Sequence, residues 1–546
     1  MNIRLTLLSA TLIMLLLLSG MLATGCGTDD VTVPDDDETV DEDVELSEED
    51  RFGGTINCAI STTVAHLDTD LTTDSYMGMI MSHVYEGLFE IDSSYNPTPY
   101  LVESYTVEND GLEYYFKLRE GVKFHNGKEM TSEDVYASMN RWLTVNGGGT
   151  RVAPYIDEVE VLGDYEIAVY FNTPYAPFLS FMSSIVANQK LVVRPSEIIE
   201  QYGEEVIEEH VGTGPYTLAE YAPDQYVRLA RFDDYSVHPG PSFAYSGTKH
   251  AYADEVIFWM VPEQSVRVAG VQSGEYHFSE LVPKEQLSQF ETDPNVVPQI
   301  IDPFRQSFII INMGYPPFDN IYARQALRHS FDMEEQSLAM VGDPDFWYLE
   351  GSLFIPGNRW HVPNAGEGKY NAYDPDKAKE LLEMAGYDGT PIIILNGNDN
   401  PIERGGALAA QEQLERVGFN VEVELYDRAT VVEQRSRVDG WNLHFSQFTT
   451  PDPDPIVYGA WMGTDKWIGN WDDEDSAKMD DLFERMAVEV DFDKRYEIVK
   501  EWHDAFYEYV PYVKVNFFNE LAVSHISLKG YEPFPYHVFF NTWLEE

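Results

Sequence analysis

The stretch FTTPDPDP, residues 448–455, contains two aspartates that could take part in catalysis or binding. Asp452 and Asp454 stand two positions apart, and a proline follows each of them. Such carboxylates can act as catalytic acids, bind a metal ion or hold a ligand. Aspartate before proline is also typical of turns, because proline restricts the conformation of the residue that precedes it. The residues alone leave these four uses open.

A second polar stretch, NGNDNPIER at residues 396–404, contains amide side chains and a single fixed cation. Asn398 and Arg404 could hold a ligand carboxylate or hydroxyl groups, because a guanidinium binds carboxylates through charge-assisted hydrogen bonds. A solvated surface loop is the alternative interpretation of the same residues.

The motifs of several enzyme and cofactor classes are absent from the sequence. It contains no G-x-x-x-x-G-K-[ST] phosphate loop, no G-x-S-x-G and no H-E-x-x-H. Asp473, Asp475 and Glu484 have the spacing of a calcium loop, but Lys478 stands where such a loop requires glycine. We therefore expect no catalytic residues, no cofactor and no metal. A hydrolase that uses two distant carboxylates remains as an alternative.

The elements around the second polar stretch can be predicted more firmly. Asp374 and Pro375 favour a helix start, and Gly386 favours its end. A strand at 391–395, a helix from about 407 to 417 and a strand at 421–426 then complete a β-α-β unit. Open α/β sheets bind ligands beyond the carboxyl ends of their strands, which is where residues 396–404 begin. Farther upstream, residues 113–119 alternate like a strand and Thr131 begins a helix.

Length and charge restrict the class of protein. The chain has 546 residues, more than one hydrophobic core usually supports, so we expect two or three lobes. Its formal net charge is −59, so we expect no nucleic acid as a partner, because polyanions are repelled.

The first 25 residues have the pattern of a secretory signal: a basic start, an apolar run from Leu5 to Ala23, and small residues. Residues 22–26 read LATGC, which resembles a bacterial lipobox, so we expect a lipid on Cys26 and an extracytoplasmic, membrane-anchored protein. A transmembrane anchor is the alternative. Residues 26–50 should form a disordered acidic tether, with 13 acidic residues between positions 29 and 50. Cys58 is then expected to be a buried small hydrophobic residue.

Several motifs of the remaining chain occur together and in a fixed order. The most specific runs from Val84 to Arg141 and contains VYEGLFEID and NPTPYLVESYTVENDGLEYYFKLREGVKFHNGKEMTSEDVYASMNR. GTGPYTL at 212–218, PPFDNIYARQALRHSFDME at 316–334, YDPDKAKELLEMAGY at 373–387 and YVPYV at 509–513 follow. Together they resemble the extracellular solute-binding proteins of ABC importers, in the oligopeptide, dipeptide and nickel-binding class (family 5).

The resemblance implies an α/β fold with two lobes, of the periplasmic-binding-protein-like type II (Venus flytrap) kind, with an extra inserted subdomain. Lobe I would comprise residues 51–84, 213–302 and 520–546, and lobe II residues 303–519. The inserted subdomain would be 85–212. Hinge crossings are expected near 301–306 and 515–520, and ligand binding would close the lobes.

The function implied is binding without catalysis. A monomeric, lipid-anchored protein would deliver a peptide or similar small polar solute to the permease subunits of an ABC importer. An oligosaccharide is the alternative ligand on the same fold. A secreted hydrolase and a structural or adhesive surface lipoprotein are the alternatives from other classes.

The resemblance also implies a set of ligand-binding residues. Peptide-binding relatives anchor the amino terminus of the ligand on an aspartate before a DP pair, and matching Asp452-Pro453 to that pair puts Thr449 at the anchoring position. A threonine lacks the fixed charge that holds an ammonium, although Asp452 or Asp454 could substitute. Arg404 lies where relatives receive peptide carboxylates, and aromatic platforms for a sugar would be Trp441, Trp461 and Trp467. The expected ligand-binding residues are His66, Asn398, Arg404, Thr449, Asp452 and Trp461.

Overall fold

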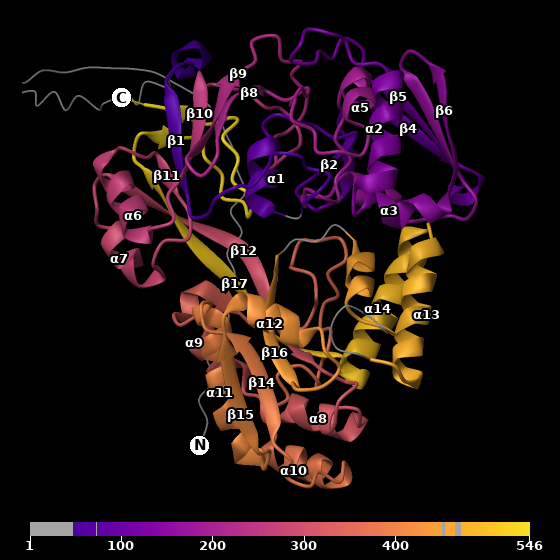
Figure 1. Ribbon diagram of the computed structural model, residues 1–546, viewed down its shortest axis with the longest axis vertical. Helices are drawn as coiled ribbons and strands as arrows, with labels where there is room; N and C mark the ends of the chain where they lie inside the picture. The colour runs from indigo at the N-terminus through magenta and orange to yellow at the C-terminus, as the bar shows by residue number, and fades with distance from the viewer. Residues whose placement is uncertain (1–46, 73, 450–453, 465–470, 546) are drawn as a thin grey trace, which may run out of the picture. The chain divides into compact units, whose positions relative to one another are not determined.

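Figure 1 shows a computed structural model of the protein, which describes residues 47–72, 74–449, 454–464 and 471–545. Within this part, Ser47–Glu546 forms one compact α/β unit. The predicted signal segment, Cys26, the tether up to residue 46, Asp452 and Trp467 lie outside the described residues.

An eleven-stranded sheet organises the molecule, in the order β15-β14-β16-β12-β17-β11-β1-β10-β9-β8, with β13 paired to β17. We call the strands at the β8 end of this order the first half-sheet and those at the β15 end the second half-sheet. The first half-sheet contains β1 (Thr55–Ile60), β8 (Tyr216–Ala222), β9 (Tyr226–Arg231), β10 (Glu255–Met260) and β11 (Phe278–Ser279). The second contains β14 (Ile392–Gly397), β15 (Val421–Tyr426) and β16 (Leu443–Thr449).

Two long antiparallel strands, β12 (Val296–Ile311) and β17 (Tyr512–His525), join the half-sheets (Figure 1). Their pairing is continuous from Val296 opposite His525 to Ile301 opposite Glu520, and it resumes with a register shift at Arg305. The short strand β13 (Trp347–Tyr348) pairs beside them. The register shift falls in the range 301–306, where the sequence analysis expects a hinge crossing, while the boundaries of the lobes remain a prediction.

The β-α-β unit is confirmed. Helix α10 (Pro375–Met384) is capped by Asp374, whose carboxylate accepts a hydrogen bond from the Lys377 backbone N–H at 2.9 Å. Strands β14 and β15 are parallel, and α11 (Pro401–Val417) connects them. Helix α11 begins earlier than expected, because the Asn400 side chain caps it and Pro401 occupies its first position. Residues 401–404 of the second polar stretch are therefore helical.

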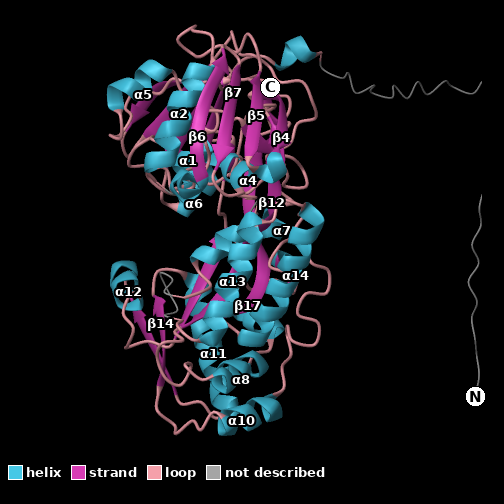
Figure 2. Cartoon of the chain, turned by 90° about the vertical axis from the view of Figure 1, so that its right-hand side faces the viewer, coloured by secondary structure: helices cyan, strands magenta, loops and turns pink. Residues whose placement is uncertain are grey.

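Four strands from the N-terminal half of the chain form a separate antiparallel sheet, in the order β4-β5-β7-β6 (Figure 2). Its strands are β4 (Val102–Glu108), β5 (Glu113–Leu118), β6 (Ile156–Gly163) and β7 (Glu166–Phe171). The predicted strand is β5, and the helix predicted at Thr131 is α2 (Ser132–Val145), which begins with a capping box between Thr131 and Asp134. Both predictions are confirmed.

The remaining elements are short or lie on the faces of the sheets. The helices are α1 (Ser75–Met81), α3 (Gly149–Val152), α4 (Phe178–Met182), α5 (Ser196–Tyr202), α6 (Gln264–Ser273), α7 (Leu287–Phe290), α8 (Ile321–Ser330), α9 (Met333–Met340), α12 (Arg428–Arg435), α13 (Glu474–Val488) and α14 (Phe492–Tyr509). Short strand pairs are β2 (Phe89–Ile91) with β3 (Pro97–Pro99), and β18 (Leu528–Lys529) with β19 (Trp543–Leu544). The 3₁₀ helices are η1 (Glu48–Arg51), η2 (Asn109–Gly111), η3 (Ala153–Tyr155), η4 (Lys284–Gln286), η5 (Pro344–Phe346) and η6 (Pro455–Ala460).

The buried apolar side chains form two large clusters. One runs through residues of the 88–193 segment and of 308–515, and the other surrounds β1, β10 and the C-terminal segment. A backbone hydrogen bond from the Ala176 N–H to the Ala487 oxygen, 2.8 Å long, also joins the 88–193 segment to α13. Cys58 is fully buried within the second cluster, as the sequence analysis expects.

Close backbone packing explains why the GTGPYTL motif contains glycines. The backbone of Gly214 and Tyr216 pairs with that of residues 83 and 84, since the Gly214 N–H donates to the Val84 oxygen at 3.0 Å. A Cβ atom on Gly212 would lie 2.1 Å from the same Val84 oxygen. Side chains larger than hydrogen cannot fit at this approach without moving backbone.

We therefore expect Gly212→Ala to lower the free energy of unfolding by about 1–3 kcal/mol, the usual cost of forcing extra volume into a packed site. The matched control is Gly163→Ala, because a Cβ there would meet nothing within 4 Å. Urea denaturation of the two variants checks this. Equal stability of the two variants would contradict the steric explanation.

Candidate functional site

A small cavity of about 30 Å³ lies where the two half-sheets approach each other. Strands β1, β10 and β11 of the first half-sheet are parallel, so their carboxyl ends share one edge, and Glu280 directly follows β11 there. Thr449 is the last residue of β16, and it lies opposite Arg305 of β12 in the antiparallel register. The cavity is lined by Ser75, Tyr76, Met79, Glu280, Arg305, Thr449, Pro535 and Tyr536.

Glu280 brings a buried carboxylate to this cavity; its side chain is 7% exposed. Its Oε1 atom accepts hydrogen bonds from the Ser61 backbone N–H at 3.0 Å and from the Ser61 hydroxyl at 2.8 Å, and its Oε2 atom lies 3.7 Å from Nε2 of His537. Burial acts to raise the pKa of Glu280, but the contacts with His537 and Ser61 outweigh it and lower the pKa below its ordinary value. The carboxylate is therefore ionised at neutral pH.

Arg305 of strand β12 brings a guanidinium to the same cavity. Its Nη1 atom lies 3.5 Å from the Gln447 side-chain oxygen, at the limit of a hydrogen bond. Arg305, Arg428 and Arg435 all act on Glu403 of α11. Burial nevertheless raises the pKa of Glu403 to about 7 against the pull of these three cations. Glu403 is therefore partly protonated near neutral pH.

Of the residues expected from the sequence, Thr449 lines the cavity. Asn398 and Arg404 lie together at the start of α11, where Arg404 Nη1 donates to the Asn398 backbone oxygen at 2.8 Å. They follow the carboxyl end of β14, which is parallel to β16, so they share an edge of the sheet with Thr449. They are not among the residues that line the cavity, and their part in binding remains a prediction.

Trp461 and His66 also lie outside the lining of this cavity. The Trp461 ring stacks on Phe448 with centroids 4.2 Å apart, so the phenyl ring covers one of its faces. Trp441 is fully buried in the core. The His66 Nδ1 atom accepts a hydrogen bond from the Asp68 backbone N–H at 3.3 Å. Asp68 belongs to a buried cluster of four charges, which is completed by Asp70, Arg141 and Arg194.

Asp454, one of the two aspartates of FTTPDPDP, has a structural role. Its carboxylate accepts a hydrogen bond from the Ile456 backbone N–H at 3.0 Å and so caps η6. Both of its oxygens also pair with the Arg495 guanidinium, at 2.6 and 2.7 Å, and both side chains are buried. Asp454 therefore orients the chain at this point.

Glu280, Arg305 and Tyr76 line the cavity but are not among the residues expected from the sequence. The sequence does contain a signal for Glu280. This residue directly follows the short strand β11, and in open α/β sheets the residues just beyond the carboxyl ends of strands contact ligands. Arg305 and Tyr76 had none, because their positions depend on pairings with residues far away in the sequence.

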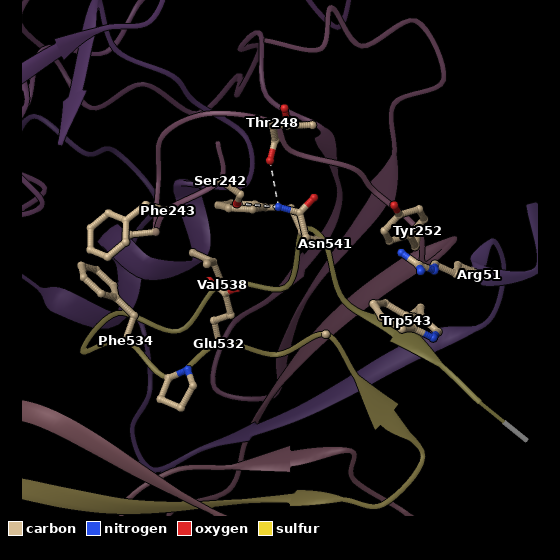
Figure 3. Close-up of a pocket in the computed structure, with 14 residues that line it drawn as sticks. Arg51, Ser242, Phe243, Thr248, Tyr252, Glu532, Phe534, Val538, Asn541 and Trp543 are labelled. Carbon is tan, nitrogen blue, oxygen red and sulfur yellow. Dashed lines mark hydrogen bonds between the residues drawn. The ribbon is translucent and has the colours of Figure 1, made fainter. Parts of the chain in front are cut away.

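A larger cavity of about 340 Å³ occupies the opposite edge of the first half-sheet (Figure 3). Arg51 and Tyr252 precede β1 and β10, so this cavity lies at the amino ends of these parallel strands. The Arg51 guanidinium stacks on the Trp543 ring at 4.4 Å from its centroid, and Asn541 donates to Ser242 Oγ at 2.9 Å. Ligand sites of open α/β sheets lie at the carboxyl ends instead, which favours the smaller cavity.

Within the described ranges, no group of three or more histidine, cysteine, aspartate or glutamate residues could hold a metal ion. The same ranges contain no helix that is long and apolar enough to span a membrane.

Comparison with known proteins gives consistent results. Residues 96–470 match the family model described as bacterial extracellular solute-binding proteins, family 5 Middle. A probable peptide ABC transporter periplasmic-binding protein, y4tO of Sinorhizobium fredii, is 27% identical over 445 residues, covering 79% of this chain and 82% of the relative. The glutathione-binding protein GsiB of Escherichia coli is 27% identical over 385 residues, covering 69% of this chain and 71% of the relative.

Among solved structures, the periplasmic binding protein DppA of Helicobacter pylori, in complex with the peptide STSA, has the same fold. The TM-score is 0.73 at 23% sequence identity, and the match covers 91% of this chain and 99% of DppA. The two-lobed α/β fold that the motifs imply is confirmed, and the inserted subdomain remains a prediction. Because the family model matches more than half of the chain, this protein belongs to the bacterial extracellular solute-binding proteins of family 5.

Proposed function

We propose that this protein captures a peptide, or a closely similar small polar solute, outside the cytoplasm and delivers it unchanged to the membrane subunits of an ABC importer. The observation that carries the proposal is the cavity at the carboxyl ends of both half-sheets, which brings an ionised carboxylate, Glu280, and a guanidinium, Arg305, to one place. Peptides carry both an ammonium and a carboxylate, and each would meet an opposite charge here. The relatives named above for a peptide and for glutathione, itself a short peptide, support the same ligand class.

Cleft closure is part of the proposal. The half-sheets are connected through β12 and β17, whose register shifts between Ile301 and Arg305. A ligand that contacts Glu280 on one side and Arg305 on the other would favour the conformation in which both contacts form. The importer would then recognise this ligand-bound conformation.

Anchoring and assembly are further parts of the proposal. A lipid on Cys26, followed by the acidic segment up to residue 50, would hold a monomeric binding protein at the outer face of a membrane. The charge of −59 would keep such a protein soluble and separate from its neighbours.

An oligosaccharide receives less support as the ligand. Sugar sites use aromatic rings with an open face; Trp441 offers none because it is fully buried, and Phe448 leaves only one face of Trp461. The cavity lining also contains a carboxylate and a guanidinium, with which a neutral ligand would make no ionic contact.

Titration of the full chain with a panel of short peptides, α- and γ-linked, tests the proposal, with oligosaccharides of similar size as the comparison. A peptide at about 100 times its dissociation constant should stabilise the protein by about 2.7 kcal/mol. Mass spectrometry should then recover the peptide intact. The proposal is wrong if no peptide stabilises the protein or if peptide fragments accumulate over many turnovers.

A further inference from the structure

The larger cavity, at the amino ends of β1 and β10, has the size of a small-molecule site but not the position expected for the transported solute. Its volume of about 340 Å³ falls within the range of about 300–1,000 Å³ that is usual for ligand pockets. Its lining residues all come from Arg51 and from the segments 242–252 and 530–543. Binding there would therefore need no contact with the second half-sheet.

One end of this cavity carries a guanidinium. The Cζ atom of Arg51 lies 4.4 Å from the ring centroid of Trp543 and 5.9 Å from that of Tyr252. Stacking on aromatic rings leaves the N–H groups of a guanidinium free to bind a planar anion in its own plane. Within the part of the chain that the structure describes, Arg51 forms no ion pair, and its buried Nε atom has no hydrogen-bond partner. A buried donor without an acceptor is unfavourable, and a ligand carboxylate would supply the acceptor.

The other end of the cavity is apolar. Phe243 and Phe534 lie there, on the side away from Arg51 and Trp543 (Figure 3). The two phenyl rings meet edge to face with centroids 5.8 Å apart. Phe534 and the neighbouring Val538 are buried. An apolar group in contact with these side chains would be removed from water, which stabilises a complex.

The walls between the two ends are fixed by hydrogen bonds. The Asn541 side chain donates to Ser242 Oγ at 2.9 Å and to the Thr248 backbone oxygen at 2.8 Å, and so joins the C-terminal segment to the segment 242–252. Gly530 leaves room for the Trp543 ring, because a Cβ atom on Gly530 would lie 2.3 Å from that ring. The cavity is therefore formed without a ligand, as is usual for small-molecule sites.

We propose that this cavity is a second ligand site, separate from that of the transported solute, which binds a small carboxylic acid with an apolar tail. Arg51 binds the carboxylate, and Phe243 and Phe534 contact the tail. Arg51 is the single cation among the lining residues, which matches one carboxylate, whereas a phosphate carries nearly two negative charges. Glu532 also lines the cavity but is exposed, and an amine is the ligand that it would favour.

Three probes with the same ring and the same chain length test this proposal: 3-phenylpropionate, 3-phenylpropionamide and 3-phenylpropylamine. Their head groups are an anion, a neutral amide and a cation. Calorimetric titration of the full chain should show that the acid binds at least about tenfold more tightly than the amide, as expected of a charge-assisted hydrogen bond. Propionate, which lacks the ring, should bind at least about tenfold more weakly than 3-phenylpropionate, because it buries much less apolar surface.

Arg51→Gln should abolish the preference for the acid over the amide, and Arg51→Lys should keep part of it because the charge remains. The matched control is Arg485→Gln, an exposed arginine of α13, which should keep the full preference. Because the preference is a ratio measured within one variant, a partial loss of folded protein does not change it.

Three results would overturn the proposal. The first is an unaltered chain that binds the acid no more tightly than the amide, which includes a chain that binds neither. The second is a chain that binds the amine most tightly, because Glu532 rather than Arg51 would then determine the ligand. The third is a preference for the acid that survives Arg51→Gln, because the acid would then bind outside this cavity.

Discussion

Arg495→Met should lower the free energy of unfolding by about 3–5 kcal/mol, the usual cost of removing one partner of a buried ion pair. Arg495 makes both of its charged hydrogen bonds to Asp454, and the two side chains are 5% and 2% exposed. Methionine fills a similar volume but leaves the Asp454 carboxylate buried without its counter-charge. Urea denaturation at neutral pH measures the difference.

The control for this variant is Arg485→Met on α13. Arg485 pairs with Glu501 at a similar distance, 2.8 Å, but its side chain is 43% exposed. Exposed pairs contribute about 0–1 kcal/mol, so this variant should be nearly as stable as the unaltered protein. Equal effects of Arg495→Met and Arg485→Met would show that Asp454 does not depend on its partner.

Acidification from pH 7 to pH 5 should lower the free energy of unfolding by about 2 kcal/mol for each of three buried histidines. His83, His444 and His503 are buried, and burial lowers the pKa of each from 6.5 to about 4. The unfolded chain therefore binds protons at a higher pH than the folded chain does. The stability is fully present above pH 6.5 and is lost as the pH falls from 6.5 toward 4.

The hydrogen bonds explain why these histidines resist protonation. In His503, Nδ1 donates to the Val499 oxygen at 2.8 Å, and Nε2 accepts from the Leu353 backbone N–H at 3.1 Å. In His83, Nε2 likewise accepts from the Phe539 N–H at 3.0 Å. A proton on either Nε2 would face another N–H. Lys514 and His361 further disfavour the charge on His503, and Glu350 opposes them.

His503→Gln is the variant that isolates one of these groups, because an amide also donates and accepts hydrogen bonds but does not titrate. The free energy of unfolding of this variant should fall less steeply between pH 7 and pH 5, because its unfolding takes up about one proton fewer. Glu403 acts in the opposite direction, because its raised pKa of about 7 favours the folded state on acidification and offsets about one histidine. A flat profile for the unaltered chain in this range would contradict the prediction.

Local sequence signals predicted local structure well. Asp374, Pro375 and Gly386 predict the bounds of α10 to within a few residues, because caps and left-handed glycines act within one helical turn. The expected start of α11 near residue 407 is wrong, because Asn400 caps the helix and it begins at Pro401. Cys58 is predicted to be a buried small residue because a lipid on Cys26 would leave it without a disulfide partner, and it is fully buried.

The candidate site could be predicted only in part, for a physical reason. Thr449 came from the motif resemblance, whereas Arg305 reaches the cavity through a register between β12 and β16, strands more than 100 residues apart. Asp454 gave no sign of being structural, because its partner Arg495 lies 41 positions away on another helix. Long-range strand pairings and buried ion pairs of this kind leave no periodic signal in the sequence.

A crystal structure of the full chain with a stabilising peptide bound is the most direct test of the central claim, that this protein holds a peptide between its two half-sheets. The account predicts ligand density in contact with Glu280 and Arg305, beside Thr449, at the carboxyl ends of β11 and β16. Density in the cavity of Arg51 and Trp543, at the opposite edge of the first half-sheet (Figure 3), would contradict it.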